Sequence, residues 1–435
     1  MSAPRPAIPD DASIIRTVQA SRAAFAAGRT AEAEQLLVRI AQVAPGHPAV
    51  LNELGVVMMS RGAAEQAHAM FDRATQVEAG QAALWSNLAS SLRALGRRQE
   101  EREALEKALA LEPRHLASLL QKAALLEELG DVRNAARLFQ QALTSIPPGS
   151  APPPSVRELV EHARQVVEAD QASLSVALEE RLGEIRTRYG GQAQRRVDRC
   201  LEMSTGRRTA YFPRPTFMYF PEIPAIEFFD RADFPWLTAL EAATDDIRNE
   251  LTNVMIADRE GLQAYIDFPA GLPIEQWKDL NHSRRWSAYF LWNQGTAVAP
   301  HLARCPKTAA ALSAVPRCDV PGRAPTAFFS ILDAATTIPP HTGVTNTRLT
   351  VHLPLIVPPK CRFRVGGTTR EWEEGKAWVF DDTIEHEAWN DSDTPRAVLI
   401  FDIWNPFLSD VERDMVRAAT EVITTYYQLP AEGQL

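Results

Sequence analysis

Two histidines, His341 and His386, are the residues in this sequence best suited to hold a metal, and Arg396 follows ten residues after the second. Imidazole is the commonest protein ligand for iron, copper and zinc. The runs RLTVHLPLIV and KAWVFDD between them are rich in β-branched and aromatic residues, and Pro, Gly and Asp interrupt them, which is typical of short strands in a jelly roll or barrel. Because distant strands can bring both histidines to one metal, we expect a mononuclear iron site inside a double-stranded β-helix.

A longer set of residues surrounds the two histidines in a fixed order: Pro340-His341-Thr342-Gly343, Arg348, His352-Leu353, Trp372-Glu373-Glu374-Gly375-Lys376, Phe380-Asp381-Asp382, Glu385-His386-Glu387, Trp389 and Arg396. Two further segments precede them, Leu291-Trp292-Asn293-Gln294-Gly295 and Pro306-Lys307-Thr308. With this set, residues 286–406 resemble the aspartyl/asparaginyl β-hydroxylases, a family of Fe(II)- and 2-oxoglutarate-dependent oxygenases. The resemblance is strong over roughly the last third of the chain and weakens upstream towards Tyr219.

The resemblance implies an iron site with two protein ligands. Most non-haem iron oxygenases add a carboxylate to the two histidines, and the position two residues after the first histidine is here Gly343. The family shares this omission, so His341 and His386 alone would hold the iron. 2-Oxoglutarate would supply two more oxygen ligands, which leaves positions for water and O2.

The resemblance also assigns residues to the two organic substrates. Arg396 would clamp the distal carboxylate of 2-oxoglutarate, because a guanidinium group meets a carboxylate through two parallel hydrogen bonds. Ser330 matches the hydroxyl partner of that carboxylate, and His352 lies near the inner carboxylate. Arg348 is the candidate group for an acidic or polar substrate. Thr350 stands where the family leads us to expect an arginine, so the usual substrate recognition is altered here.

Several of these residues also have an ordinary structural interpretation. Arg348 and His352 could simply satisfy a buried strand. Asp381 and Asp382 could orient the imidazole rings from a second layer of contacts, but a turn between strands favours Asp as well. We expect Trp372 and Trp389 to lie in the hydrophobic core.

Three classes of function remain open from the sequence. The first is a 2-oxoglutarate dioxygenase that hydroxylates a side chain, most simply the β-carbon of Asp or Asn in a peptide or protein; a small molecule or peptide natural product remains an alternative substrate. The second is a 2-oxoglutarate halogenase, in which a small residue such as Gly343 opens a chloride site. The third is a tetratricopeptide interaction protein with a weakly active or inactive oxygenase domain. Gly343 alone does not separate the first two classes, but the resemblance assigns the EGK…FDD…EHEAW pattern to the hydroxylases. Retention of His341, His386, Ser330 and Arg396 together argues against the third class.

Composition excludes other classes. The 435 residues are enough for two or three domains, and 45% hydrophobic with 23% charged residues is typical of a globular protein. A formal charge of -9 argues against a nucleic-acid partner. The start of the chain lacks the order of a signal peptide, and no apolar run is long enough to span a membrane. Relatives in the secretory pathway carry two cysteines where this chain has Leu302 and Ala309. We therefore expect a reducing, cytoplasmic location.

The N-terminal third contains an internal repeat. Gly28, Gly62, Gly96 and Gly130 recur every 34 residues, which is the tetratricopeptide period. A large apolar residue follows each glycine by nine positions, and Pro45, Pro113 and Pro147 close three of the repeats. We expect two helices per repeat, the first ended by glycine and the second by proline. Four such units over residues 12–149 predict a solenoid that could bind a peptide or protein substrate.

The expected architecture is therefore a multidomain α+β protein, an all-α tetratricopeptide solenoid followed by a jelly-roll oxygenase domain with flanking helices. Residues 1–11 are Pro-rich and expected to be disordered. Residues 150–210 should form a linker and capping helices, with a stiff proline spacer over 147–154 and a helix that begins with a capping box at Ser155 and Glu158. Residues 211–435 form the oxygenase domain with its core at 286–406. It begins with an extended aromatic arm and includes helices over 237–257 and 408–427.

Overall fold

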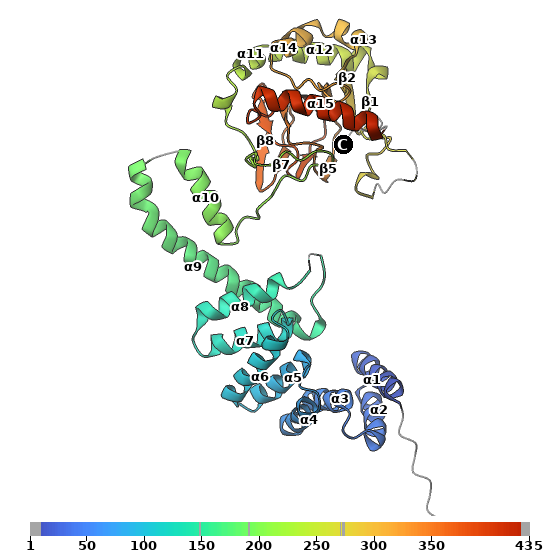
Figure 1. Cartoon of the computed structure of the whole chain (residues 1–435), viewed down its shortest axis with the longest axis vertical. Coiled ribbons are helices and arrows are strands. Elements are labelled where there is room, and N and C mark those ends of the chain that lie inside the picture. Colours follow the sequence, from blue (N-terminus) through green and yellow to red (C-terminus); the bar gives the residue numbers. More distant parts are fainter. Residues whose placement is uncertain (1–9, 148, 190–191, 270, 272–274, 428–435) are drawn as a thin grey trace, which may run out of the picture. The chain divides into compact units, whose positions relative to one another are not determined.

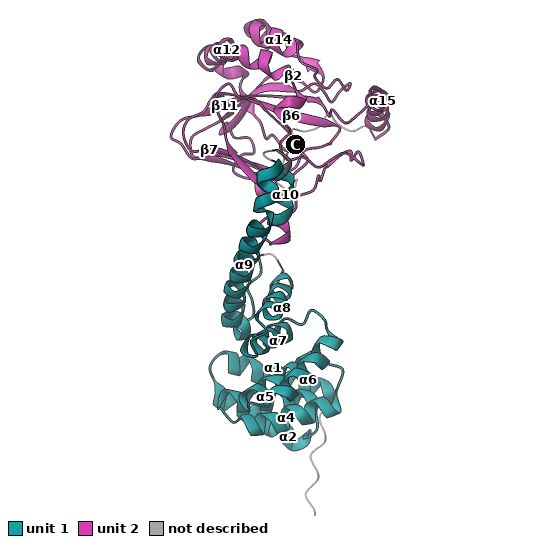
Figure 2. Ribbon diagram, turned by 90° about the vertical axis from the view of Figure 1, so that its left-hand side faces the viewer, with its two compact units in different colours: residues 1–201 teal, residues 202–435 magenta. Residues whose placement is uncertain are grey.

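The computed structural model describes residues 10–427 except 148, 190–191, 270 and 272–274. The chain divides into two compact units, residues 1–201 and residues 202–435 (Figure 2). This division falls inside the stretch 150–210 that we expected to connect the two domains. None of the helices among the described residues is both long and apolar enough to cross a membrane.

Unit 1 begins with four consecutive helix pairs, as the 34-residue period predicts (Figure 1). The pairs are α1 (Asp11–Ala26) with α2 (Thr30–Val43), α3 (Pro48–Ser60) with α4 (Ala64–Val77), α5 (Ala82–Ala94) with α6 (Arg98–Leu111), and α7 (Leu116–Glu128) with α8 (Val132–Thr144). The four repeat glycines follow the first helix of each pair with φ between 72° and 82°, a left-handed conformation that a side chain would strain. Disorder was expected over residues 1–11, of which 1–9 lie outside the described residues. The expectation is wrong for the last two, because Asp10 is the N-cap of helix α1 and Asp11 is its first residue.

The prediction for the stretch after the repeats needs two corrections. Helix α9 (Arg157–Tyr189) follows a short 3-10 turn, η1 (Pro154–Val156), so Ser155 lies inside this turn and does not start a capping box. The spacer is not a straight rod, because the Ser150 amide donates to the Pro147 carbonyl at 3.1 Å and closes a turn. Through this turn α9 packs back on the last repeat and buries Val160, Ala163 and Val167, so the expected cap on the solenoid is present. Helix α10 (Gln192–Ser204) follows.

Unit 2 contains two antiparallel sheets. The larger sheet has the order β1 (Gln263–Ala264), β2 (Trp286–Asn293), β4 (Ala327–Leu332), β11 (Arg396–Trp404), β6 (Arg348–Ile356) and β9 (Trp378–Phe380), with β3 (Thr296–Ala297) beside β2. The smaller sheet has the order β5 (Thr336–His341), β10 (His386–Asn390), β7 (Cys361–Val365) and β8 (Thr368–Glu371). From β4 to β11 the chain passes back and forth between the two sheets, except at the β7–β8 hairpin, which stays in the smaller sheet; this is the strand order of an eight-stranded jelly roll.

Strand alternation separates packing from chemistry in the larger sheet. On one face, alternate residues such as Phe329, Val351 and Leu399 form a core with the outer helices. On the other face, the intervening positions carry Ser330, His352 and Arg396, among others, towards the smaller sheet. Successive side chains of a strand point to opposite faces, so each strand supplies the core on one face and the site on the other.

The outer face of the larger sheet is covered by helices (Figure 1). The expected helix over 237–257 is broken at Ala243 into α11 (Leu237–Ala242) and α12 (Thr244–Ala257), yet Leu240, Ile247 and Leu251 pack on the sheet as predicted. The other helices of this unit are α13 (Ala299–Arg304), α14 (Pro306–Ser313), α15 (Asp410–Tyr427) and the short turns η2 (Arg231–Asp233), η3 (Arg259–Gly261) and η4 (Glu275–Trp277).

The aromatic arm after α10 is extended, as expected, and pairs with loops of the jelly roll. The amides of Arg214 and Thr216 donate to the carbonyls of Thr383 and Gly343 at 2.7 and 3.2 Å. The Gly343 amide in turn donates to the Asp382 carbonyl at 2.7 Å. The arm therefore ties together the two loops that border the metal-binding candidates.

Candidate active site

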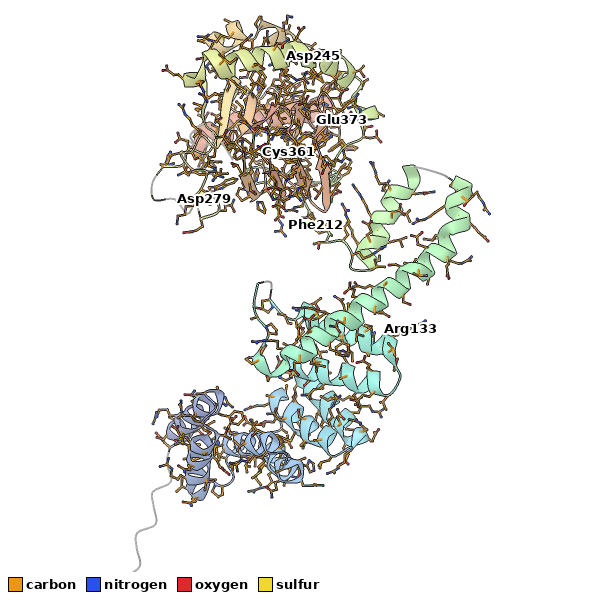
Figure 3. The ribbon with its side chains drawn as sticks, turned by 180° about the vertical axis from the view of Figure 1, so that it is seen from behind. Arg133, Phe212, Asp245, Asp279, Cys361 and Glu373 are labelled. Carbon is orange, nitrogen blue, oxygen red and sulfur yellow. The ribbon has the colours of Figure 1, made fainter. Side chains whose placement is uncertain are left out.

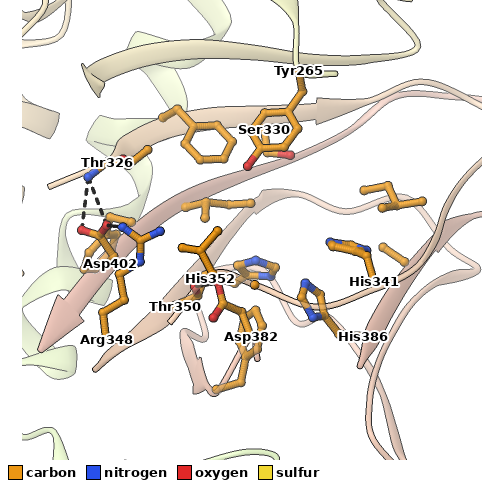
Figure 4. Close-up of a pocket in the computed structure, with 18 of the residues that line it drawn as sticks. Tyr265, Thr326, Ser330, His341, Arg348, Thr350, His352, Asp382, His386 and Asp402 are labelled. Carbon is orange, nitrogen blue, oxygen red and sulfur yellow. Dashed lines mark hydrogen bonds and ion pairs between the residues drawn. The ribbon is translucent and has the colours of Figure 1, made fainter. Parts of the chain in front are cut away.

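His341 and His386 lie side by side on neighbouring strands of the smaller sheet. His341 ends β5, His386 begins β10, and the two residues are register partners. Their ring centroids lie 4.0 Å apart, although 45 positions separate them in the sequence. The jelly roll thus brings together the two residues that the sequence singled out, and both line one cavity of about 140 Å³ (Figure 4).

Both imidazoles are held in the form that binds a metal. The Nδ1 atom of His341 lies 2.8 Å from the Pro339 carbonyl, and that of His386 lies 3.1 Å from the Ile384 carbonyl. A carbonyl can only accept, so Nδ1 carries the proton and Nε2 keeps its lone pair. Burial lowers the pKa of His386 to about 4 and that of His341 well below its usual range. The rings are therefore neutral near pH 7, as metal binding requires.

Arg396 lies fully buried at the start of β11, on the larger sheet. Its guanidinium group stacks over the Trp372 ring, 4.6 Å from the centroid, and Trp372 is buried as expected. The Nε and Nη1 atoms of Arg396 are buried without a hydrogen-bond partner among the described residues. Burial lowers the pKa of this arginine to about 10, so it stays charged near pH 7. An unsatisfied buried guanidinium at a cavity wall is a site for a carboxylate.

Ser330 and His352 line the same cavity from strands on either side of β11. The Ser330 hydroxyl accepts a hydrogen bond from Trp286 Nε1 at 3.1 Å, which leaves its own proton to donate. His352 is packed among aromatic rings, and its Nδ1 atom is buried without a partner among the described residues. Burial, with the charge of Arg396, holds the pKa of His352 well below its usual range. The structure therefore groups all three predicted cosubstrate residues on one sheet.

The two predicted substrate residues also line this cavity, but each already has a partner. Arg348 Nη1 lies 3.1 Å from Asp402 Oδ2 and donates to the Arg323 carbonyl at 3.3 Å. The Thr350 hydroxyl donates to Asp382 Oδ2 at 3.1 Å. Figure 4 shows the histidine pair at one side of the cavity and the Arg348–Asp402 pair at the other.

Asp382 occupies the space that Gly343 leaves beside the histidines. A Cβ atom added at Gly343 would overlap the Asp382 carboxyl group. Asp382 Oδ1 is buried without a partner among the described residues, and burial raises the pKa of this carboxyl group. Within the described residues no three His, Cys, Asp or Glu side chains are arranged to hold a metal. Asp382 therefore lies beside the histidine pair without completing a three-residue ligand set.

The idea that Asp381 and Asp382 orient the imidazole rings by hydrogen bonds from their side chains is wrong. Backbone carbonyls do this, as the Nδ1 contacts show. The Asp381 carboxylate instead accepts from the amide and hydroxyl of Thr383 at 2.9 and 2.6 Å, which makes it a turn residue. Trp389, expected in the core, is only half-buried and lies under the guanidinium group of Arg362.

Sequence reasoning missed several cavity residues, among them Tyr265 and Asp402. Tyr265 directly follows β1, and its ring lies 4.2 Å from Trp286 and 5.2 Å from Phe328, which builds an aromatic wall. Asp402 is buried on β11, where burial raises its pKa to about 6 against the opposing effect of Arg348. No sequence signal marked Tyr265. Asp402 could have been found, because it continues the inward-facing alternation that starts at Arg396.

A second hollow, of about 460 Å³, lies on the other side of His341. Its walls come from the aromatic arm, from Gln276 and Trp277, and from the loop after β5. Phe212 of the arm is 65% exposed there (Figure 3). The aromatic arm therefore lines a groove beside His341.

Comparison with known proteins supports the resemblance read from the sequence. Residues 241–406 match the family model described as aspartyl/asparaginyl beta-hydroxylase. Residues 24–92 and 82–115 match two tetratricopeptide repeat models. The chain therefore combines a domain similar to this hydroxylase family with tetratricopeptide repeats.

Individual relatives match over part of their length. The chain is 35% identical over 181 residues to the human aspartyl/asparaginyl beta-hydroxylase, covering 41% of this chain and 24% of that protein. It is 36% identical over 184 residues to the ornithine lipid ester-linked acyl 2-hydroxylase of Rhizobium tropici, covering 42% and 61%. A solved tetratricopeptide protein of Thermus thermophilus covers 45% of this chain and 97% of its own at 18% identity, with a TM-score of 0.32.

Proposed function

We propose that this protein is an Fe(II)- and 2-oxoglutarate-dependent dioxygenase that hydroxylates an unactivated carbon of its substrate. The observation that carries the proposal is one cavity that joins two neutral, oriented imidazoles to a buried arginine with unsatisfied donors. The two imidazoles suit a divalent metal, and the arginine suits a carboxylate. The relatives named as hydroxylases support the reaction class.

His341 and His386 would hold the iron through Nε2. When bound, iron and 2-oxoglutarate supply the oxidation, in which O2 gives one oxygen atom to a substrate C–H bond and the other to succinate, with release of CO2. Arg396 and Ser330 bind the distal carboxylate, and the nearby His352 stays neutral, so it can donate to or accept from the inner end. The Asp382 carboxyl group, with one oxygen that has no partner among the described residues, could accept a hydrogen bond from a group bound in the cavity.

Two alternatives find less support. A halogenase needs a vacant chloride position beside Gly343, but the Asp382 carboxyl group fills this space. An inactive domain would have no chemical reason to keep Arg396 buried with unsatisfied donors, since such burial costs stability.

The substrate is the less defined part of the proposal. The resemblance favours the β-carbon of Asp or Asn in a peptide or protein, and the repeats of unit 1 would recruit it. The Rhizobium relative is named for an acyl chain, which makes an acyl carbon the second candidate. Cys305, Cys318 and Cys361 are buried cysteines, and the reducing, cytoplasmic location expected from the sequence remains part of this proposal.

The proposal is tested by turnover. The purified chain with Fe(II), 2-oxoglutarate and O2 should form succinate, and mass spectrometry of a treated cell extract should find molecules that gain one oxygen atom. His341→Ala and His386→Ala should abolish succinate formation. His282→Ala is the matched control, because this histidine is exposed and bonded to Asp267 on the surface. Normal turnover by either site variant would refute the assignment.

A further inference from the structure

Most of the positively charged side chains that line the cavity already have interaction partners, so they are not available to a substrate. Three arginines line it, Arg323, Arg348 and Arg396. Arg348 is paired with the buried Asp402 at 3.1 Å. Arg323 lies over the Phe217 ring and donates to the Thr424 hydroxyl at 3.3 Å. Arg396 is the one of the three with buried nitrogens that lack a partner among the described residues.

The proposed cosubstrate would use this remaining cation. Once a carboxylate of 2-oxoglutarate binds Arg396, a second carboxylate from an acidic substrate would meet two arginines that are already engaged. It would also share the cavity with the Asp382 and Asp402 carboxylates. Burying a charge without a new partner is costly, because its hydration is lost. The pocket therefore disfavours an acidic reacting group.

The surface left for the substrate is largely aromatic and aliphatic. Tyr265 stacks on Phe328 at an interplanar angle of 23°, and Phe290 lies 5.1 Å from Phe328. Ile338 and Ile400 continue this wall around the cavity. Binding of an apolar carbon chain to such a surface is favourable, because both are removed from water, whereas a charged group finds no compensating partner on it.

We propose that the group hydroxylated in this cavity is an uncharged aliphatic chain, and that the Arg348–Asp402 pair excludes carboxylate-bearing groups. The inference rests on the proposed dioxygenase function and narrows its substrate. It disfavours the aspartate β-carbon, which the family resemblance would suggest first. Asp402 acts as a positioning residue, because it selects substrates by neutralising Arg348.

Two matched probes test the inference on the full chain. Octanamide and the monoamide of suberic acid share an eight-carbon chain and one amide, and differ by a terminal carboxylate. Each is titrated calorimetrically into the protein loaded with Fe(II) and 2-oxoglutarate without oxygen. Octanamide should bind at least about tenfold more tightly, which corresponds to about 1.4 kcal/mol. Equal binding, tighter binding of the acid, or no binding of octanamide would overturn the inference.

A single substitution should reverse this preference. Asp402→Asn removes the negative charge opposite Arg348, so the acidic probe should gain at least about tenfold in affinity while octanamide changes little. Asp391→Asn is the control, since it releases Arg362, a surface arginine outside the cavity, and should alter neither affinity. An unchanged preference in folded Asp402→Asn would refute the role of the pair. If this variant does not fold, the comparison of probes on the unaltered protein decides the question.

The two proposals fail in distinguishable ways. Succinate formed from 2-oxoglutarate without either probe reports the dioxygenase function alone. If the unaltered protein forms no succinate, the proposed function is refuted. Succinate formation that depends on His341, together with equal affinity for both probes, would refute only the substrate class.

Discussion

The two units of this protein differ in how far apart in the sequence their contacting residues lie. In unit 1 each helix packs on the next one along the chain, so a 34-residue period specifies the whole solenoid. In unit 2 the site joins residues from Ser330 to Arg396, carried by strands of two sheets. Sequence neighbours therefore stabilise the repeats, whereas register between distant strands creates the site. Disturbing one unit should leave the property of the other intact, and this separation can be tested.

The largest effect is expected at Arg396. A charge-assisted hydrogen bond contributes about 1.5 to 3 kcal/mol, so Arg396→Ala should weaken 2-oxoglutarate binding about ten- to a hundredfold and leave iron binding nearly unchanged. Arg396→Lys should recover part of the loss, because lysine lacks the planar fork. Isothermal titration with 2-oxoglutarate and iron gives both affinities, and Arg362→Ala is the surface control. A parallel loss of iron would indicate misfolding of unit 2 instead.

Replacing one closely packed glycine in each unit with alanine, Gly343 in unit 2 and Gly55 in unit 1, compares the two units directly. An added Cβ at Gly343 would displace the Asp382 carboxyl group and break its hydrogen bond with Thr350. Gly343 lies two residues after His341 and its amide is bonded to the Asp382 carbonyl, so this displacement would shift a metal ligand, and disturbed surroundings of metal ligands typically cost about 10- to 100-fold in metal affinity. Gly343→Ala should therefore weaken iron binding by about tenfold or more, measured by anaerobic titration. Unchanged iron affinity would show that Asp382 has no influence on the metal.

Gly55 is the counterpart in unit 1. Its added Cβ would overlap the Phe71 ring between α3 and α4, and overpacking typically costs about 1 to 3 kcal/mol. Gly55→Ala should lower the thermal stability of the repeats, seen by circular dichroism at 222 nm. Succinate formation without substrate should stay at the level of the unaltered protein. A loss of this turnover would show that the activity of unit 2 depends on the stability of unit 1.

A smaller, substrate-dependent effect is expected from the first helices of the middle repeats. Asn87 Nδ2 donates to Asn52 Oδ1 at 2.8 Å and joins α5 to α3. If unit 1 recruits a long substrate, the double change Asn52→Ala and Asn87→Ala should reduce its turnover several-fold and spare turnover of a short analogue. Gln76→Ala, on the second helix of its repeat, is the control. Equal kinetics on both substrates would make the solenoid a scaffold only.

The last prediction is that mild acid leaves the affinity for Fe(II) unchanged. Burial lowers the pKa of His386 to about 4 and that of His341 well below its usual range. Both rings should therefore stay neutral at pH 5.5, so protons do not compete with the metal there and Fe(II) affinity should be the same at pH 7 and pH 5.5. Histidines with the ordinary pKa of about 6.5 would each lose about tenfold over this interval. Such a loss would show that the pair is more hydrated than the structure indicates.

Sequence reasoning reached the parts of the molecule that local patterns specify. The repeat glycines, the proline stops and the strand-like runs around His341 and His386 all carry short-range signals. Contacts across the sheets carry none. Asp382 fills the space beside Gly343, 39 positions away, and Asp402 neutralises Arg348, 54 positions away. These pairings follow from strand register, which a single sequence does not reveal, and they decide whether Arg348 is available to a substrate.

The central claim is that His341 and His386 form one iron site next to the 2-oxoglutarate site of Arg396. Anaerobic addition of Fe(II) and then 2-oxoglutarate to the full chain tests it, because iron chelated by 2-oxoglutarate shows a weak visible charge-transfer band. The band should appear in the unaltered protein and in His282→Ala, and should be absent from His341→Ala and His386→Ala. A band of full intensity in either site variant would contradict the claim.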